Sequence, residues 1–235
     1  EYEYGAQLDG NNDTDGQIKI EQAWVDYKFS DALIQRTGIV VVPFGRLNVL
    51  HDSDVRDATN RPVYAKKVVP TTWMDTGVGA HGVLDFDETE VTYEAYMLNG
   101  LQDSSTVSIS GGIRGARPSL KSDNNRTKAF MTRVGVSPFV GLELATSYYT
   151  GKLDSGESKA DISMLGFDAF YKAGAFELLG EYAQNDLSDV ANTIPESMNG
   201  YYGEARYHIT GDWLKNSPFG QGFRNPVITL FARYG

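Results

Sequence analysis

A group of basic side chains lies within a long segment that follows neither a strand nor a helix period. The segment, residues 43–75, comes directly after the apolar run 39–42, and Pro62 and Pro70 are incompatible with a regular β-ladder within it. Basic side chains that line a narrow passage attract anions and set its selectivity. The candidates for such a constriction are Arg46, Arg56, Arg61, Lys66 and Lys67.

The same charges could instead form a solvated loop surface. Between Arg46 and Lys67, five basic residues stand against Asp52, Asp54 and Asp57, which gives a net charge of +2 in 22 residues. The whole chain carries a net charge of −10, so the local bias is modest. Long loops with apolar anchors are usually functional, and we expect this one to fold onto another part of the chain.

A second group of charges recurs along one side of the predicted strands. Side chains alternate between the two faces of a strand, and here charged residues occupy one face while apolar residues occupy the other. The charges could set up a transverse field across a water-filled lumen, or they could pair between strands and hold the register. The candidates for lumen charges are Arg36, Glu94, Arg133, Glu143, Glu181, Arg206 and Arg233.

A weak candidate for a calcium site precedes Gly16. Asn11, Asp13 and Asp15 offer oxygen ligands at alternating positions, as in the first half of a calcium-binding loop. The twelfth position holds Gln22 in place of the bidentate glutamate. An Asp-Gly hairpin turn explains the same residues without a metal.

Motifs for catalysis are missing from the sequence. It contains neither GxSxG, HExxH nor a P-loop. The three histidines have no metal-binding spacing, and they are His51, His81 and His208. We therefore predict no enzyme activity and no cofactor.

Alternation of apolar and polar residues predicts β-strands along most of the chain. A phase shift within residues 17–29 predicts a β-bulge in one continuous strand. The sequence supports eleven strands and no long helix. The predicted strands are residues 2–8, 17–29, 33–42, 76–84, 88–98, 128–136, 141–150, 162–172, 175–184, 199–209 and 227–234.

The connections alternate between short and long. Short turns fall near Ser30, Phe86, Pro138 and Gly174, and long loops fall between them. In an up-and-down antiparallel sheet, this alternation places all tight turns at one end and all long loops at the other, as in outer-membrane β-barrels. Greek-key sandwiches mix connection lengths at both ends. The exception is residues 210–225, for which the sequence suggests a short helical plug or cap around Trp213.

Composition fits the same fold class. The chain has 235 residues, 14 Tyr, 11 Phe and no Cys, and its mean hydropathy of −0.35 excludes a long apolar helix. The acidic isoelectric point of about 4.8 argues against nucleic acid as a partner. We predict one incomplete domain over residues 1–235: an all-β, antiparallel up-and-down transmembrane β-barrel. Because barrels of this kind have even strand numbers, we expect a fragment of about 11 strands from a barrel of 16.

Several stretches carry a resemblance to a known family. They are VDYKFS (25–30), VPFGRLN (42–48), RPV (61–63), VVPTTWMDTGVG (68–79), YEAYMLNG (93–100) and NPVITLFARY (225–234). Together they resemble the porin family typified by the phosphate-selective porins O and P. The resemblance implies a 16-stranded outer-membrane barrel, often a trimer, with a long loop folded inward. It gives residues 43–75 a place inside the barrel or at the subunit contact. The mixed acidic and basic residues of the expected lumen do not match the arginine ladder of the phosphate-selective members.

The sequence therefore predicts a porin in the outer membrane of a Gram-negative cell. It would form a water-filled channel for passive diffusion of small hydrophilic solutes or ions, constricted by residues 43–75. Its expected partners are membrane lipid, the solutes and two further copies in a homotrimer. Two alternatives stay open: a scaffold barrel whose loops or plugged lumen bind another protein or a surface polymer, and a soluble β-sandwich adhesin or lectin.

Overall fold

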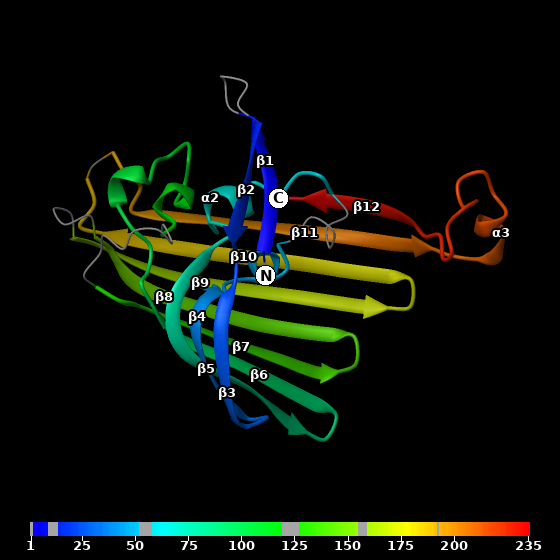
Figure 1. The fold of residues 1–235 in the computed structure, drawn as a ribbon, viewed down its shortest axis with the longest axis horizontal. Helices are drawn as coiled ribbons and strands as arrows, with labels where there is room; N and C mark the ends of the chain where they lie inside the picture. The colour runs from blue at the N-terminus through cyan, green and yellow to red at the C-terminus, as the bar shows by residue number, and fades with distance from the viewer. Residues whose placement is uncertain (1, 9–13, 52–57, 119–126, 155–158, 192) are drawn as a thin grey trace.

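The computed structural model describes residues 2–8, 14–51, 58–118, 127–154, 159–191 and 193–235, with side chains from residue 20 onward except those of 154 and 159. Ten strands form one antiparallel sheet in chain order, each paired with its neighbours in sequence (Figure 1). They are β3 Ala23–Ser30, β4 Leu33–Val41, β5 Met74–Phe86, β6 Thr89–Leu98, β7 Ala129–Phe139, β8 Leu142–Asp154, β9 Lys159–Ala173, β10 Phe176–Ser188, β11 Ser197–Ile209 and β12 Ile228–Tyr234. The up-and-down antiparallel topology predicted from the connections is confirmed.

The prediction of one bulged strand over residues 17–29 was wrong. The chain forms β2 (Thr14–Ile20) and then β3, with a break at Glu21 and Gln22. β2 pairs with β1 (Tyr2–Leu8) in a separate two-stranded sheet. Glu21 is buried, and its carboxylate lies 3.5 Å from the Nε2 atom of His51. The phase shift in the sequence therefore marks the residue that leaves the sheet to meet another segment.

Tight turns and long connections lie at opposite ends of the sheet, as the sequence predicted. Two residues connect each of the pairs β3–β4, β5–β6, β7–β8 and β9–β10. Gly141 and Gly174 take φ values of 98° and 58° in two of these turns, a conformation that tight hairpins require and glycine adopts readily. In Figure 1 the β5–β6, β7–β8 and β9–β10 turns lie on the right, as does the connection that contains α3 (Asp212–Lys215), and the β3–β4 turn lies at the bottom. The connection between β8 and β9 is shorter than expected because both strands extend further, to Asp154 and from Lys159.

The two faces of the sheet reverse the pattern of a soluble protein: apolar side chains are exposed on one face, and charged side chains are buried on the other. In β10, Phe176, Leu178 and Tyr182 are exposed, whereas Glu177 and Glu181 are buried on the other face. The apolar side chains of the strands thus point outward. The face that carries the charges, which we call the covered face, lies under two of the long connections.

Those two connections build the core together with the covered face. The first loop, residues 42–73, contains α1 (Arg46–Val49) and α2 (Tyr64–Lys67). The second loop, whose described part is residues 99–118, contains the short 3-10 helices η2 (Ser104–Thr106) and η3 (Arg114–Ala116). Trp73 is fully buried between Phe44 and Tyr149, and its ring centroid lies 5.0 Å from that of Tyr149. Of the apolar anchors expected in the first loop, Tyr64, Val68, Val69 and Trp73 are core residues, whereas Val63 is exposed. None of the helices in the described residues is long and apolar enough to cross a membrane.

Candidate functional site

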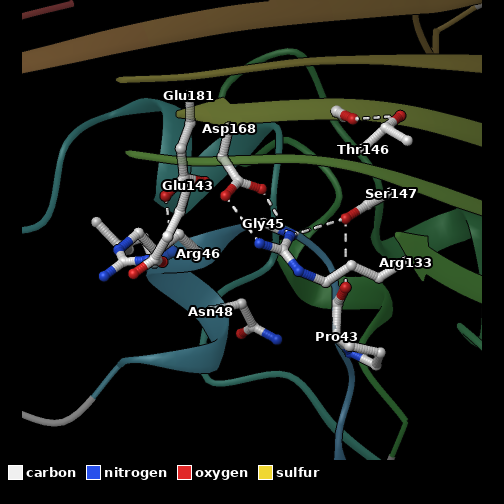
Figure 2. A network of polar contacts seen from close by, with 12 residues as sticks. Pro43, Gly45, Arg46, Asn48, Arg133, Glu143, Thr146, Ser147, Asp168 and Glu181 are labelled. Carbon is white, nitrogen blue, oxygen red and sulfur yellow. Dashed lines mark hydrogen bonds and ion pairs between the residues drawn. The ribbon is translucent and has the colours of Figure 1, made fainter. Parts of the chain in front are cut away.

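The start of the first loop is fixed to the wall of the sheet by a buried polar network (Figure 2). The Arg133 guanidinium donates two hydrogen bonds to the Asp168 carboxylate, at 2.6 and 2.8 Å, and a third to Ser147 Oγ at 3.1 Å. Ser147 Oγ in turn donates to the carbonyl oxygen of Pro43 and accepts from the N–H of Gly45, both at 3.3 Å. One ion pair between β7 and β9 therefore orients a serine that holds two residues of the loop.

Glu181 of β10 forms a second attachment. One carboxylate oxygen accepts hydrogen bonds from the backbone N–H of Leu47 at 2.6 Å and from the hydroxyl of Tyr202 at 2.7 Å. Its other oxygen is buried without a hydrogen-bond partner among the described residues. A Cβ atom on Gly45 would lie 2.6 Å from that oxygen, and Gly45 has a φ of 73°. Glycine at position 45 is thus required both by the backbone conformation and by the proximity of Glu181.

Asn48 joins the two ends of the first loop. Its amide nitrogen donates to the carbonyl oxygens of Val42 and Trp73, at 2.7 and 3.3 Å. Its amide oxygen accepts from the N–H of Trp73 at 2.9 Å. Asn48 is fully buried, so these three bonds satisfy a side chain that has no access to water.

Further along, the first loop reaches the last strands of the sheet. Asn185 of β10 donates to the carbonyl oxygen of Val68 at 2.7 Å, and α2 packs beside β11. Tyr64 and Tyr202 lie with ring centroids 5.4 Å apart. Arg233 of β12 donates to the carbonyl oxygen of Asn60. The loop therefore crosses the covered face from β8 to β12.

The second loop braces the far end of the first. Arg114 donates to the carbonyl oxygen of Thr71, and Arg117 donates to Thr71 and to both the carbonyl and hydroxyl oxygens of Thr72. Thr72 has a φ of 60°, which is unfavourable for a β-branched residue. Burial and repulsion from Arg114 and Arg61 lower the pKa of Arg117 to about 10, which leaves it charged at neutral pH. Arg114 and Arg61 thus both lie within electrostatic reach of Arg117.

The predicted basic residues of the first loop fall into two sets. Arg46 pairs with Glu143 and stacks over the ring of Phe170, 4.1 Å from its centroid. Arg61 donates to the carbonyl oxygen of His51. Lys66 and Lys67 are exposed, and neither ammonium group has an ion pair with any residue that the structure describes. Arg56, together with Asp52, Asp54 and Asp57, lies outside the described residues.

The predicted strand charges are mostly paired with other strand charges. Arg36 forms two hydrogen bonds with Asp26 on the neighbouring strand, and the Glu94 carboxylate accepts from the hydroxyl of Tyr96. Arg206 and Arg233 both pair with Glu204. These contacts do not converge on one site. They favour the interpretation that cross-strand pairs hold the register of the sheet.

The metal candidate is not addressed by the structure. Asn11 and Asp13 lie outside the described residues, and Asp15 is described only in its backbone. Among the side chains that are described, no group of three or more His, Asp or Glu residues could hold a metal ion.

Several residues of this arrangement escaped sequence reasoning. Ser147, Tyr202, Asn185 and Asn48 are single polar residues within strands or a loop, and nothing in their spacing distinguishes them. Arg114 and Arg117, in contrast, could have been identified as candidates from the sequence. They are two basic residues in a Gly-rich loop that joins the same rim as the first loop, in an acidic chain.

The fold and the covered face together define a class of protein. A sheet of successive antiparallel strands with apolar side chains outward, and charged side chains beneath its own loops, is the wall of a membrane β-barrel. The chain belongs to the family described as phosphate-selective porin O and P, whose model matches residues 1–220. Membership in this family implies a β-barrel of the Gram-negative outer membrane.

A curated relative gives the extent of the match. An uncharacterized protein of Aquifex aeolicus (strain VF5) is 23% identical over 218 residues, which cover 83% of this chain and 48% of the relative. The chain therefore spans about half the length of the curated relative that it matches. No solved structure matches the chain.

Proposed function

We propose that the protein forms a water-filled channel through which small hydrophilic solutes or ions diffuse passively, with the first loop as the constriction. The observation that carries the proposal is the course of this loop across the charged face of the sheet. It is attached at Ser147 and Glu181 near its start and at Asn185 near its end. In a closed barrel, a segment held in this position narrows the lumen.

The mechanism combines size exclusion and electrostatic filtering. The wall contributes little net field where its charges are paired, as in Arg133 with Asp168 and Arg206 with Glu204. The loops contribute positive charge that is less balanced. The basic residues of the two loops within the described residues are Arg46, Arg61, Lys66, Lys67, Arg114 and Arg117. We therefore propose a modest preference for anions over cations, set by the loops.

The family likeness supports two further proposals. The channel assembles as a homotrimer in the outer membrane, with lipid around the apolar outward face. β3 and β12 each pair with only one strand in the sheet described here, so a closed barrel needs partners for these two edges. The position of the first loop at a subunit contact is the alternative to a position within the lumen.

Planar bilayer recordings of the full-length protein test the proposed function. We expect stepwise openings in KCl, and a reversal potential under a salt gradient that indicates anion preference. A purified, folded protein that gives no conductance above background would contradict the channel function. A cation preference would reject the loops as the selective element while leaving the channel intact.

A plugged scaffold barrel is the second candidate function. It is favoured by the apolar core between the loops and the covered face, where Phe44, Trp73 and Tyr149 are fully buried. A core of this kind fills space that solutes would otherwise use. The same recordings separate the candidates, because a plugged barrel stays silent whereas a constricted channel conducts.

A further inference from the structure

The connection between β11 and β12 is unlike the other tight-turn connections. It comprises residues 210–227, which we call the rim segment, whereas each of the other four connections at this end has two residues. In Figure 1 it projects beyond the end of β11 on the side of the tight turns. A turn of two residues would suffice to reverse the chain, so the length of the rim segment needs its own explanation.

The rim segment is compactly folded. Its backbone closes a series of turns, with hydrogen bonds from Leu214 to Gly211, from Ser217 to Leu214 and from Gly220 to Ser217. A Cβ atom on Gly220 would lie 1.8 Å from the carbonyl oxygen of Leu214, so the backbone at Gly220 packs directly against the backbone at Leu214. Leu214 is buried. The segment therefore has a defined shape and is not a loose linker.

Despite this compact fold, the rim segment exposes three aromatic rings. Trp213 is 61%, Phe219 81% and Phe223 69% exposed. The basic side chains of Lys215 and Arg224 accompany them on the same segment. A folded loop that buries one leucine and exposes three large aromatic side chains has an apolar surface of the kind that contacts lipid or another molecule.

The neighbouring strands indicate what covers it. On the outward face, Phe176 packs on Tyr207 near the tight turns, with ring centroids 4.6 Å apart. Tyr182 and Tyr201 are paired further along the same two strands. The six residue steps from Phe176 to Tyr182 span about 20 Å along the strand, which a strand tilt of about 40° turns into about 15 Å of the roughly 25 Å apolar band of outer-membrane barrels.

The rim segment begins three residues beyond Tyr207, and its last residue precedes the outward-facing Ile228 and Leu230 of β12. The rim segment thus joins the ends of two strands whose outward faces are apolar, at the end of the sheet where lipid headgroups would follow the acyl chains. Trp and Phe favour this boundary, and Lys and Arg beside them complement lipid phosphates. A covering protein would need no such continuity with the lipid-facing strands.

We propose that the rim segment is a membrane anchor that inserts Trp213, Phe219 and Phe223 into the lipid headgroup region on the tight-turn side. The anchor fixes the height of this edge of the barrel in the bilayer. The proposal rests on the placement of the outward face in the outer membrane and is independent of conduction.

Residues 1–235 contain no cysteine, so single labelling sites can be introduced here once any cysteine elsewhere in the full-length protein is replaced by serine. Full-length F219C and F223C variants are labelled with an environment-sensitive nitrobenzoxadiazole dye and reconstituted in phosphatidylcholine–phosphatidylglycerol vesicles. E88C, in the β5–β6 turn of the same rim, is the water reference, and L178C, on the outward face of β10, is the acyl-chain reference. Quenching is measured with shallow and deep doxyl lipids and with aqueous cobalt.

We expect shallow doxyl lipid to quench the dye at 219 and 223 at least about twofold more than at 88. Aqueous cobalt should quench it correspondingly less. Quenching at both positions equal to that at 88 would overturn the anchor. Protection from lipid and cobalt together would also overturn it, because a second copy or another protein would then cover the rings. If L178C itself escapes lipid quenching, the outer-membrane placement fails, and the proposal fails with it.

Discussion

Glu181 accepts a hydrogen bond of 2.6 Å from the backbone N–H of Leu47, although the two residues are 134 positions apart in the chain. The contact joins the middle of β10 to the first helix of the loop that we propose as the constriction. Tyr202 on the next strand donates to the same oxygen. One buried carboxylate of the wall is therefore among the groups that hold the start of the loop in place.

Replacing Glu181 tests this attachment. E181A removes the acceptor for Leu47 and Tyr202, and leaving such buried donors unsatisfied costs about 1–3 kcal/mol each. We expect a larger and noisier single-channel conductance, because the start of the loop is released. E181Q keeps an acceptor oxygen and should restore a conductance close to that of the parent. If E181A conducts like the parent while folding normally, the loop does not depend on this residue.

The glycine beside Glu181 gives a matched comparison. G45A and G174A both place alanine at a positive φ, which costs about 1–2 kcal/mol. Only at position 45 would the new Cβ also meet a neighbour, Glu181 Oε2, whereas nothing lies within 4 Å of position 174. We expect G45A to lower the thermal midpoint of the full-length protein clearly more than G174A. Equal shifts would show that Glu181 and Gly45 are not in contact.

Arg133 and Asp168 should stabilise the wall only while both partners are present, because either charge alone would be buried without its counter-charge. D168A leaves a mostly buried guanidinium without its carboxylate, which we expect to lower the free energy of unfolding by about 3 kcal/mol. The double variant R133M/D168A removes both charges and should be less destabilised than D168A alone. Urea unfolding in lipid vesicles measures both. A double variant that is less stable than D168A would contradict the interpretation.

Charge reversal at exposed loop lysines tests selectivity. K66E/K67E should move the reversal potential under a KCl gradient toward cation preference, because these side chains have no ion pair with the described residues. R46Q is the control. Arg46 is already paired with Glu143, so its removal should shift the potential less. A larger shift for R46Q than for K66E/K67E would assign the filter to the start of the first loop, where Arg46 meets Glu143, and not to the exposed lysines.

Much of the fold was predictable from the sequence because alternation and connection length are local signals. The pattern in residues 176–182 places Phe176, Leu178 and Tyr182 outward, and the structure confirms it. The break at Glu21 was missed because a bulge and a departure from the sheet produce the same phase shift. Only the long-range contact of Glu21 with His51 distinguishes them.

The arrangement of the candidate site was less predictable. Arg133 and Glu181 were predicted from the sequence as lumen charges, but the sequence could not show that Arg133 orients Ser147 and that Glu181 holds Leu47. Such contacts join residues far apart in the chain, and single polar residues within strands carry no spacing signal. The basic group of the first loop was predicted as a whole, yet only three-dimensional contacts separate paired Arg46 from exposed Lys66.

The central claim is that the first loop lies in the path of the solute. It is tested most directly in the full-length protein, with any cysteine outside residues 1–235 replaced by serine, by recording from a single K66C channel while a charged methanethiosulfonate reagent is added. We expect a stepwise loss of current as the side chain is modified, and no change for L178C, whose side chain points outward. An unchanged current, with mass spectrometry confirming modification of Cys at position 66, would contradict the claim.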